Sequence, residues 1–161
     1  MISFLFNTVA GKIITTFFIS MVPVIELRVA IPWATGMGLS PWVAIPVAIV
    51  GNLIPIPFII IFIKRIFAWM RKVSPKLNKV VDKMEAKAEK NKAKVLRYAF
   101  WGLALFVAIP LPGTGAWTGA LVAAMLDMPL KKAFPSVVLG VLCAGVVVAF
   151  VSYGAAALFF G

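Results

Sequence analysis

The feature that most constrains the fold of this chain is an interrupted apolar segment that occurs twice. Residues 22–25, Val-Pro-Val-Ile, are matched by residues 109–112, Ile-Pro-Leu-Pro. Three more pairs follow at an offset of 88 or 89 residues: Pro41 and Pro129, Pro46 and Pro135, and Gly51 and Gly140. Apolar helices that are interrupted at corresponding places in two halves are typical of secondary transporters with inverted repeats. The pattern therefore predicts a membrane transporter built from two related units.

Composition and length support a single integral membrane domain. Of the 161 residues, 63% are hydrophobic, whereas soluble domains contain about 45–50% apolar residues. Residues 42–63 and 136–160 are each long enough to cross a hydrocarbon core of about 30 Å. Prolines at 46, 55 and 57 predict a kink or break of the first span near Asn52. The chain has no His and a single Cys, so an enzyme is the least supported class, and we expect no cofactor or metal.

Four further apolar segments are too short to span a bilayer. They cover residues 12–22, 29–38, 98–109 and 116–126, and the first extends about 16 Å as a helix. Paired around the two turns, they predict two re-entrant hairpins. The alternative, one straight helix through each turn, would place Glu26 and Arg28 at the centre of a span, where each charge costs about 2.5–3.5 kcal/mol. The predicted fold is thus an all-α membrane protein with repeats at 1–63 and 98–161, joined by a linker at 64–97.

The positive charge of the chain is concentrated in this linker. The net charge is +11, and twelve of the sixteen Lys and Arg lie in residues 64–97. Because Lys and Arg are enriched in cytoplasmic segments, we expect a multi-pass protein of the cell membrane with a cytoplasmic linker and both termini outside. Apolar residues at three- and four-residue steps predict an amphipathic helix from Val73 to Arg97. Contact with anionic lipids is a second interpretation of the basic residues. Nucleic-acid binding is disfavoured because no aromatic residues are interleaved with the basic residues from Arg71 to Arg97.

Glu26 and Arg28 are the charged residues predicted to lie deepest in the membrane. An ionisable residue at that depth is a functional candidate by default. Burial disfavours a charged carboxylate and a neighbouring guanidinium favours it, so the pair is suited to gaining and losing a proton. The structural alternative is that Glu26 caps the free N–H groups of the returning helix, with Arg28 as its neutralising partner.

The second turn contains Gly113, Thr114 and Gly115. Two glycines allow consecutive N–H groups to converge at a helix N-terminus, which suits a phosphate or carboxylate, although such sequences are also common in simple turns. Four residues could line a cavity beside the two turns. They are Trp33, Asn52, Trp117 and Thr118, which carries a hydroxyl group. An interfacial aromatic belt explains the tryptophans equally simply, and Asn52 could instead form a bond between helices.

These residues resemble a known family. The order Pro23-x-x-Glu26-Leu27-Arg28, a basic linker, and then residues 110–115, Pro-Leu-Pro-Gly-Thr-Gly, is similar to the small multidrug export protein family. That family is in turn similar in architecture to the DedA, or VTT-domain, superfamily. The resemblance implies proton-coupled transport, and it implies that Glu26 corresponds to the acidic residue of the first hairpin. DedA-like relatives are implicated in flipping phospholipids and undecaprenyl phosphate.

Three classes of function are compatible with these observations. The main interpretation is a proton-coupled transporter of an amphiphilic anion, such as a phospholipid or polyprenyl phosphate, with membrane lipids and protons as partners. Under it Glu26 is a protonatable switch, while Arg28 and the amides of residues 113–115 hold the anionic group. The first alternative is a small-molecule or multidrug exporter, and the second is a non-transporting assembly or scaffold protein. A homodimer is compatible with so small a unit.

Overall fold

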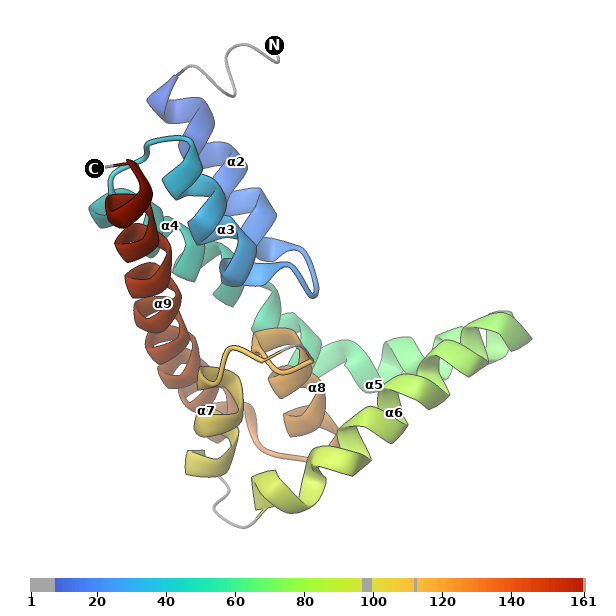
Figure 1. Cartoon of the computed structure of the whole chain (residues 1–161). Coiled ribbons are helices and arrows are strands. Elements are labelled where there is room, and N and C mark those ends of the chain that lie inside the picture. The colour runs from blue at the N-terminus through green and yellow to red at the C-terminus, as the bar shows by residue number, and fades with distance from the viewer. Residues whose placement is uncertain (1–7, 97–99, 112, 161) are drawn as a thin grey trace.

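All regular structure in the described part of the chain is helical, as predicted. The structure, a computed structural model, describes residues 8–96, 100–111 and 113–160, without the side chains of residues 87, 88, 91–96, 159 and 160. Its helices are α2 (Val9–Met21), α3 (Glu26–Gly36), α4 (Pro41–Leu53), α5 (Pro55–Val73), α6 (Pro75–Leu96), α7 (Phe100–Ala108), α8 (Ala116–Met125) and α9 (Leu130–Phe160) (Figure 1). Pro112 of the second turn and residues 97–99, where the linker meets the second unit, lie outside the described residues.

The four helices that flank the two turns, α2, α3, α7 and α8, are too short to cross a bilayer. The longest of them is α2, with 13 residues, or about 20 Å, against about 30 Å of hydrocarbon. A turn at residues 22–25 separates α2 from α3, and the two helices pack against each other. Residues 109–115 separate α7 from α8 in the same way. The straight-helix alternative is therefore wrong for both segments.

Within the described residues, two helical segments are long and apolar enough to span a membrane, Pro41–Val73 and Leu130–Leu158. The predicted break near Asn52 is confirmed, because α4 ends at Leu53 and α5 begins at Pro55. Pro55 and Pro57 have no N–H to donate, so the hydrogen-bond ladder is interrupted at this point. After the break, α5 takes a different direction from α4 and joins α6 in an arm that projects from the other helices (Figure 1). The helix predicted between Val73 and Arg97 is confirmed as α6.

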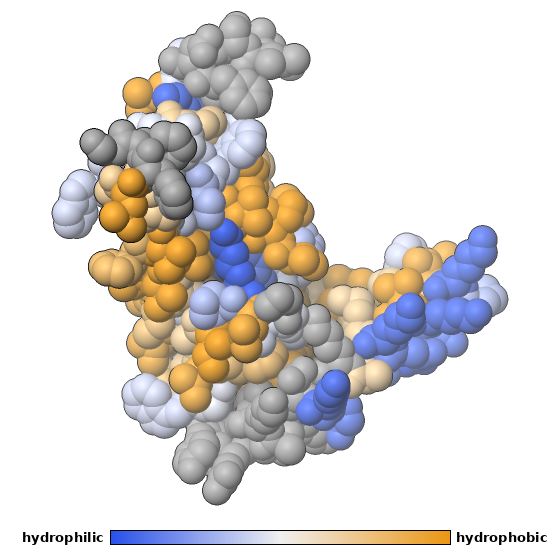
Figure 2. All heavy atoms as spheres, in the orientation of Figure 1, coloured by the Kyte–Doolittle hydropathy of each residue, from blue (hydrophilic) through white to orange (hydrophobic). Residues whose placement is uncertain are grey.

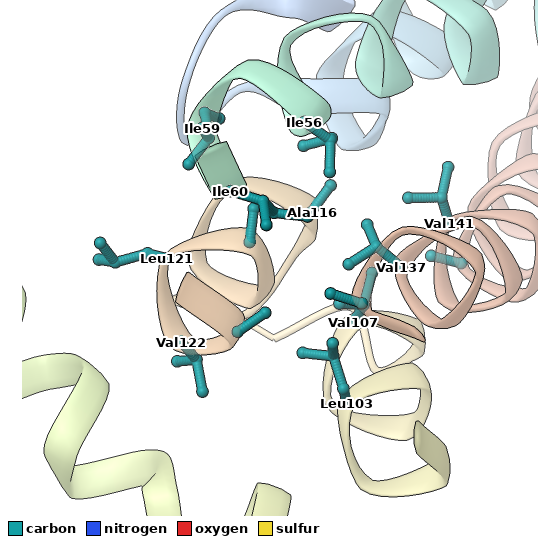
Figure 3. Packing of buried hydrophobic residues seen from close by; sticks show 14 of the residues in the cluster. Ile56, Ile59, Ile60, Leu103, Val107, Ala116, Leu121, Val122, Val137 and Val141 are labelled. Atoms are coloured by element: carbon teal, nitrogen blue, oxygen red, sulfur yellow. The ribbon is translucent and has the colours of Figure 1, made fainter. Parts of the chain in front are cut away.

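The main core lies between α5, α7, α8 and α9. Figure 3 shows Ile56 and Ile60 of α5 beside Ala116 of α8, with Leu103 and Val107 of α7 facing Val137 and Val141 of α9. These apolar side chains are almost completely buried. Helix α8 is rich in alanine and glycine, so its neighbouring helices can approach it closely. The core therefore surrounds α8, the helix that follows the Gly-Thr-Gly turn.

Gly51 and Gly140, which the sequence offset pairs, both lie at close contacts between helices. A Cβ added to Gly51 would lie 2.6 Å from the Phe17 carbonyl oxygen of α2, and one added to Gly140 would lie 2.6 Å from the Ala104 carbonyl oxygen of α7. Both distances are too short for a side chain, so α2–α4 and α7–α9 can pack this closely only because glycine stands at these positions.

Gly140→Ala is expected to lower the free energy of unfolding by about 1–3 kcal/mol, because the added methyl group pushes α7 away from α9. Unfolding of the detergent-solubilised protein in a graded series of sodium dodecyl sulfate measures the change. Gly154→Ala is the matched control on the same helix, since nothing lies within 4 Å of its added Cβ. Equal destabilisation by the two variants would contradict the close α7–α9 contact.

Candidate functional site

Glu26 links the two halves of the molecule. It is the first residue of α3, its side chain is 3% exposed and its backbone is left-handed, with φ 53°. Its carboxylate accepts hydrogen bonds from the backbone N–H groups of Ala116, at 3.3 Å, and Trp117, at 3.0 Å. These are the first N–H groups of α8, which have no partner within their own helix and lie at its positive end. Glu26 therefore caps α8 from 90 residues away.

Arg28 holds the turn that precedes α8. Its guanidinium donates to the Ile109 carbonyl oxygen at 3.2 Å, to the Thr114 hydroxyl oxygen at 3.0 Å and to the Leu111 carbonyl oxygen. The Ile109 carbonyl follows the C-terminal end of α7, where carbonyl groups lack helical partners and the helix dipole favours a cation. Glu26 and Arg28 also interact electrostatically with each other. Two charged residues at the start of α3 thus bind the end of α7 and the start of α8, on either side of the second turn.

The Gly-Thr-Gly turn has the geometry expected of an anion-binding helix start. Gly113 and Gly115 have φ of 90° and 126°, conformations that favour glycine, and α8 begins at Ala116. The carboxylate bound there is that of Glu26. The structure therefore shows the capping arrangement that the sequence offers as the alternative, but the capped helix is α8 and not α3, whose N-cap residue forms no side-chain bond.

A cavity of about 490 Å³ lies beside these contacts. Six of the residues predicted for the site line it: Glu26, Arg28, Gly113, Thr114, Trp117 and Thr118. Its remaining wall is mostly apolar and includes Ile59 and Ile63 of α5, Met84 of α6 and Leu121 of α8. The cavity thus combines a large apolar wall with one acidic, one basic and two hydroxyl side chains, as sites for amphiphilic molecules do.

A second cavity of about 270 Å³ lies on the other side of Arg28. It is lined by Pro32 and by residues of α9 that include Val147 and Val151, and Arg28 and Pro110 border both cavities. Figure 2 shows a strip of hydrophilic atoms between α9 and the α2–α3 pair, with apolar surface on both sides. Arg28 therefore borders both the larger cavity and a smaller one whose wall includes exposed apolar residues of α9.

Comparison with known proteins identifies the class. A family model described as "Putative small multi-drug export protein" matches residues 26–147, which run from the start of α3 through the second turn and α8 into α9. The chain belongs to the small multidrug export protein family. No curated protein and no solved structure gives a significant match. The family and the two long apolar helices identify a membrane protein.

Three predicted site residues of this family member do not line the larger cavity. Trp33 is 39% exposed on α3, where an aromatic belt explains it best. Asn52 is 1% exposed, and neither polar atom of its amide has a hydrogen-bond partner within the described residues. Gly115 lies behind Glu26 at the start of α8.

The apolar wall is the part of the site that sequence reasoning missed. Ile59 and Ile63 belong to a continuous apolar run, in which no pattern distinguishes a cavity-lining side chain from one that faces lipid. Of these wall residues, only Met84 was indicated by a sequence pattern, because it belongs to the apolar positions of the predicted linker helix.

Proposed function

We propose that this family member is a proton-coupled membrane transporter that exports an amphiphilic small molecule through the cavity beside Glu26. The observation that carries the proposal is a buried carboxylate in the cavity wall that also caps a helix from the other half of the chain. A proton arriving at this carboxylate would act on the substrate site and on the junction between the halves at once.

The proposal includes two inverted repeats with re-entrant hairpins, and recurring local structure supports them. The three backbone hydrogen bonds that close α3, donated by Met37, Gly38 and Leu39, recur 89 residues later as those that close α8, donated by Leu126, Asp127 and Met128. In Figure 1, α2 and α4 run downward along the chain, whereas α7 and α9 run upward. The start of α2 and the end of α9 lie at the same end of the molecule, in keeping with both termini on one side of the membrane.

Protonation of Glu26 would loosen the junction between α3 and α8. Hydrogen bonds to a charged acceptor contribute about 1.5–3 kcal/mol, against about 0.5–1.5 kcal/mol for a neutral one. A neutral Glu26 would also lose its attraction to Arg28 and to the positive end of α8. The two hairpins could then move apart, so that the cavity opens to one side of the membrane when Glu26 is protonated and to the other when it is charged.

Flipping of a lipid phosphate is the second candidate, because the smaller cavity beside Arg28 is lined by exposed α9 residues that a lipid could approach. It requires more rearrangement than export of a small molecule. The guanidinium would have to leave the acceptors at Ile109, Leu111 and Thr114 before it could bind a phosphate, and the amides of α8 would have to release Glu26.

Glu26→Gln is expected to abolish the pH dependence of transport, because glutamine keeps the shape of the side chain but cannot exchange a proton. Proteoliposomes are given an imposed pH gradient at several values between about pH 5.5 and 8, so that a pH profile of transport is recorded. Efflux of a fluorescent amphiphilic dye and movement of a fluorescent phosphatidylglycerol are measured in parallel. We expect wild type to move the dye in response to the gradient.

Glu89→Gln on α6 is the control, since it makes the same chemical change at an exposed residue outside the cavity. Its transport should follow the wild-type pH profile. If Glu26→Gln also keeps that profile, Glu26 is a helix cap and the coupling mechanism is wrong. Movement of the lipid probe but not of the dye would favour the second candidate.

A further inference from the structure

We propose that the arm formed by α6 and the C-terminal half of α5 lies on the membrane surface and that a row of its lysines binds the head groups of anionic phospholipids. This inference concerns residues of α5 and α6 that do not line the cavity, and it does not depend on the proposed transport function. It rests on how the arm separates its charges, on its exposed apolar stripe and on its attachment to a membrane span.

The acidic and basic residues of α6 occupy different faces. Arg71, near the end of α5, forms ion pairs with Asp82 at 3.0 Å and Glu85 at 2.6 Å, and its guanidinium also donates to the Asn78 side chain at 2.8 Å. These two carboxylates are therefore engaged in joining α6 to α5. They are not available to neutralise the lysines of the same helix.

The lysines form a row on another face of α6. Lys76, Lys79, Lys83 and Lys90 follow one another at steps of three, four and seven residues, which places them on one side of a helix. All four are exposed. The row extends about 21 Å along the helix axis, so its charges are spread over a length suited to several head groups and do not converge on one small anion.

The arm also exposes an apolar stripe on α5. Phe58, Phe62, Ile66, Trp69 and Val73 follow at three- and four-residue steps, and each is at least 40% exposed. In water such a stripe is unfavourable, at about 25 cal/mol for each Å² of exposed apolar surface. Figure 2 shows the hydrophilic and apolar atoms of the arm gathered along different sides.

This combination fits a lipid surface better than a free anion. The lysines of α6 and the apolar and aromatic residues of α5 lie along different sides of the arm. An amphipathic helix with the same separation lies in the membrane interface, with its apolar side among the acyl chains. The arm is attached directly to such a position, because α5 belongs to the candidate span Pro41–Val73 and its apolar stripe begins within that span. Each basic residue close to an anionic leaflet contributes about 1 kcal/mol, whereas inorganic phosphate would leave the apolar stripe in water.

The test measures lipid selectivity of the full-length protein in vesicles of phosphatidylcholine that contain a trace of spin-labelled lipid. We expect wild type to associate with labelled phosphatidylglycerol more strongly than with labelled phosphatidylcholine. Changing all four row lysines to glutamine should reduce this preference about two- to tenfold, since surface charges are partly screened. Changing them to arginine should retain it, which shows that charge and not folding is responsible.

Lys131→Gln combined with Lys132→Gln removes exposed charge at the start of α9 and serves as the control for total charge. A loss of preference as large in this control as in the lysine-row variant would overturn the proposal. Unchanged preference after loss of the row would also overturn it. So would displacement of the labelled lipid by inorganic phosphate beyond the effect of sodium chloride at equal ionic strength.

A depth measurement tests the apolar stripe separately. In a Cys143→Ala background, a fluorophore is attached at Trp69→Cys or at Lys79→Cys, and quenching by lipids labelled in mid-chain is recorded. We expect stronger quenching at position 69 than at position 79, because the stripe points into the acyl chains and the row toward the head groups. Absence of quenching at both positions would place the arm in water.

Discussion

Gly115→Ala is expected to destabilise the protein by about 3 kcal/mol or more. The backbone of Gly115 has φ of 126°, where an L-residue is strained by about 1–3 kcal/mol. A Cβ added there would also lie 2.9 Å from the carboxyl carbon of Glu26, so the carboxylate would have to move. Displacing it weakens two charge-assisted bonds to α8, and hydrogen bonds of this kind contribute about 1.5–3 kcal/mol.

Unfolding in a graded series of sodium dodecyl sulfate, followed by circular dichroism, measures this loss. Gly36→Ala is the matched control, because Gly36 is the last residue of α3 and nothing lies within 4 Å of its added Cβ. We expect the control to be neutral or to gain up to about 1 kcal/mol from helix propensity. An equal change in the free energy of unfolding for the two variants would mean that the Glu26 carboxylate does not contact Gly115.

Arg28→Ala is expected to cost about 2–3 kcal/mol and to connect the two cavities that Arg28 separates. The substitution leaves the carbonyl groups of Ile109 and Leu111 without their charged donor, and it removes the opposite charge beside buried Glu26. We place the loss below that of a fully buried pair because Arg28 is half-buried. The stability of Arg28→Lys should fall between those of wild type and Arg28→Ala, because an ammonium group cannot reproduce the planar, forked set of hydrogen bonds that the guanidinium donates.

The readouts for Arg28 are unfolding as above and passive efflux of the dye from proteoliposomes without a pH gradient. We expect Arg28→Ala to raise passive efflux, because the barrier between the cavities is removed. Arg65→Ala, at an exposed position on α5, should stay within about 0.5 kcal/mol of wild type and should not leak. Unaltered efflux in Arg28→Ala would show that Arg28 braces the turn without closing a passage.

A double-mutant cycle with Thr114→Val isolates one contact of this turn. Arg28 donates to the Thr114 hydroxyl, which in turn lies 2.7 Å from the Ile109 carbonyl oxygen and 2.9 Å from that of Leu111. Residues in one hydrogen-bond network show coupling energies of about 0.5–3 kcal/mol. Coupling in this range would identify Arg28 and Thr114 as one unit that holds the turn.

Much of the fold follows from local features that the sequence displays. The turns at residues 22–25 and 109–115 carry prolines or glycines, which disfavour a continuous helix, so the short helices beside them could be placed to within a few residues. The break between α4 and α5 follows from Pro55 and Pro57 for the same reason. Membrane location follows from the length of the apolar segments, which depends on composition and not on packing.

The partners of Glu26 and Arg28 were decided by tertiary structure. Every helix start has free N–H groups, so the sequence does not indicate whether Glu26 caps α3, which it begins, or α8, which lies 90 residues away. Two of the oxygen atoms that accept from Arg28 belong to the backbone, which every residue possesses. Only the packing of α3 against the second half brings these charges to the ends of α7 and α8.

The sequence by itself therefore determined the helices, the offset between matching prolines and glycines, and the two charges beside the first turn, because each depends on residue type and spacing along the chain. Tertiary structure alone decided the cavity wall of Ile59, Ile63 and Met84, and the direction of the α5–α6 arm after Ile54. The physical reason is that hydrophobic side chains are attracted to lipid, to a core and to a cavity alike. Which of these an isoleucine meets depends on the shapes of neighbouring helices that are distant in sequence.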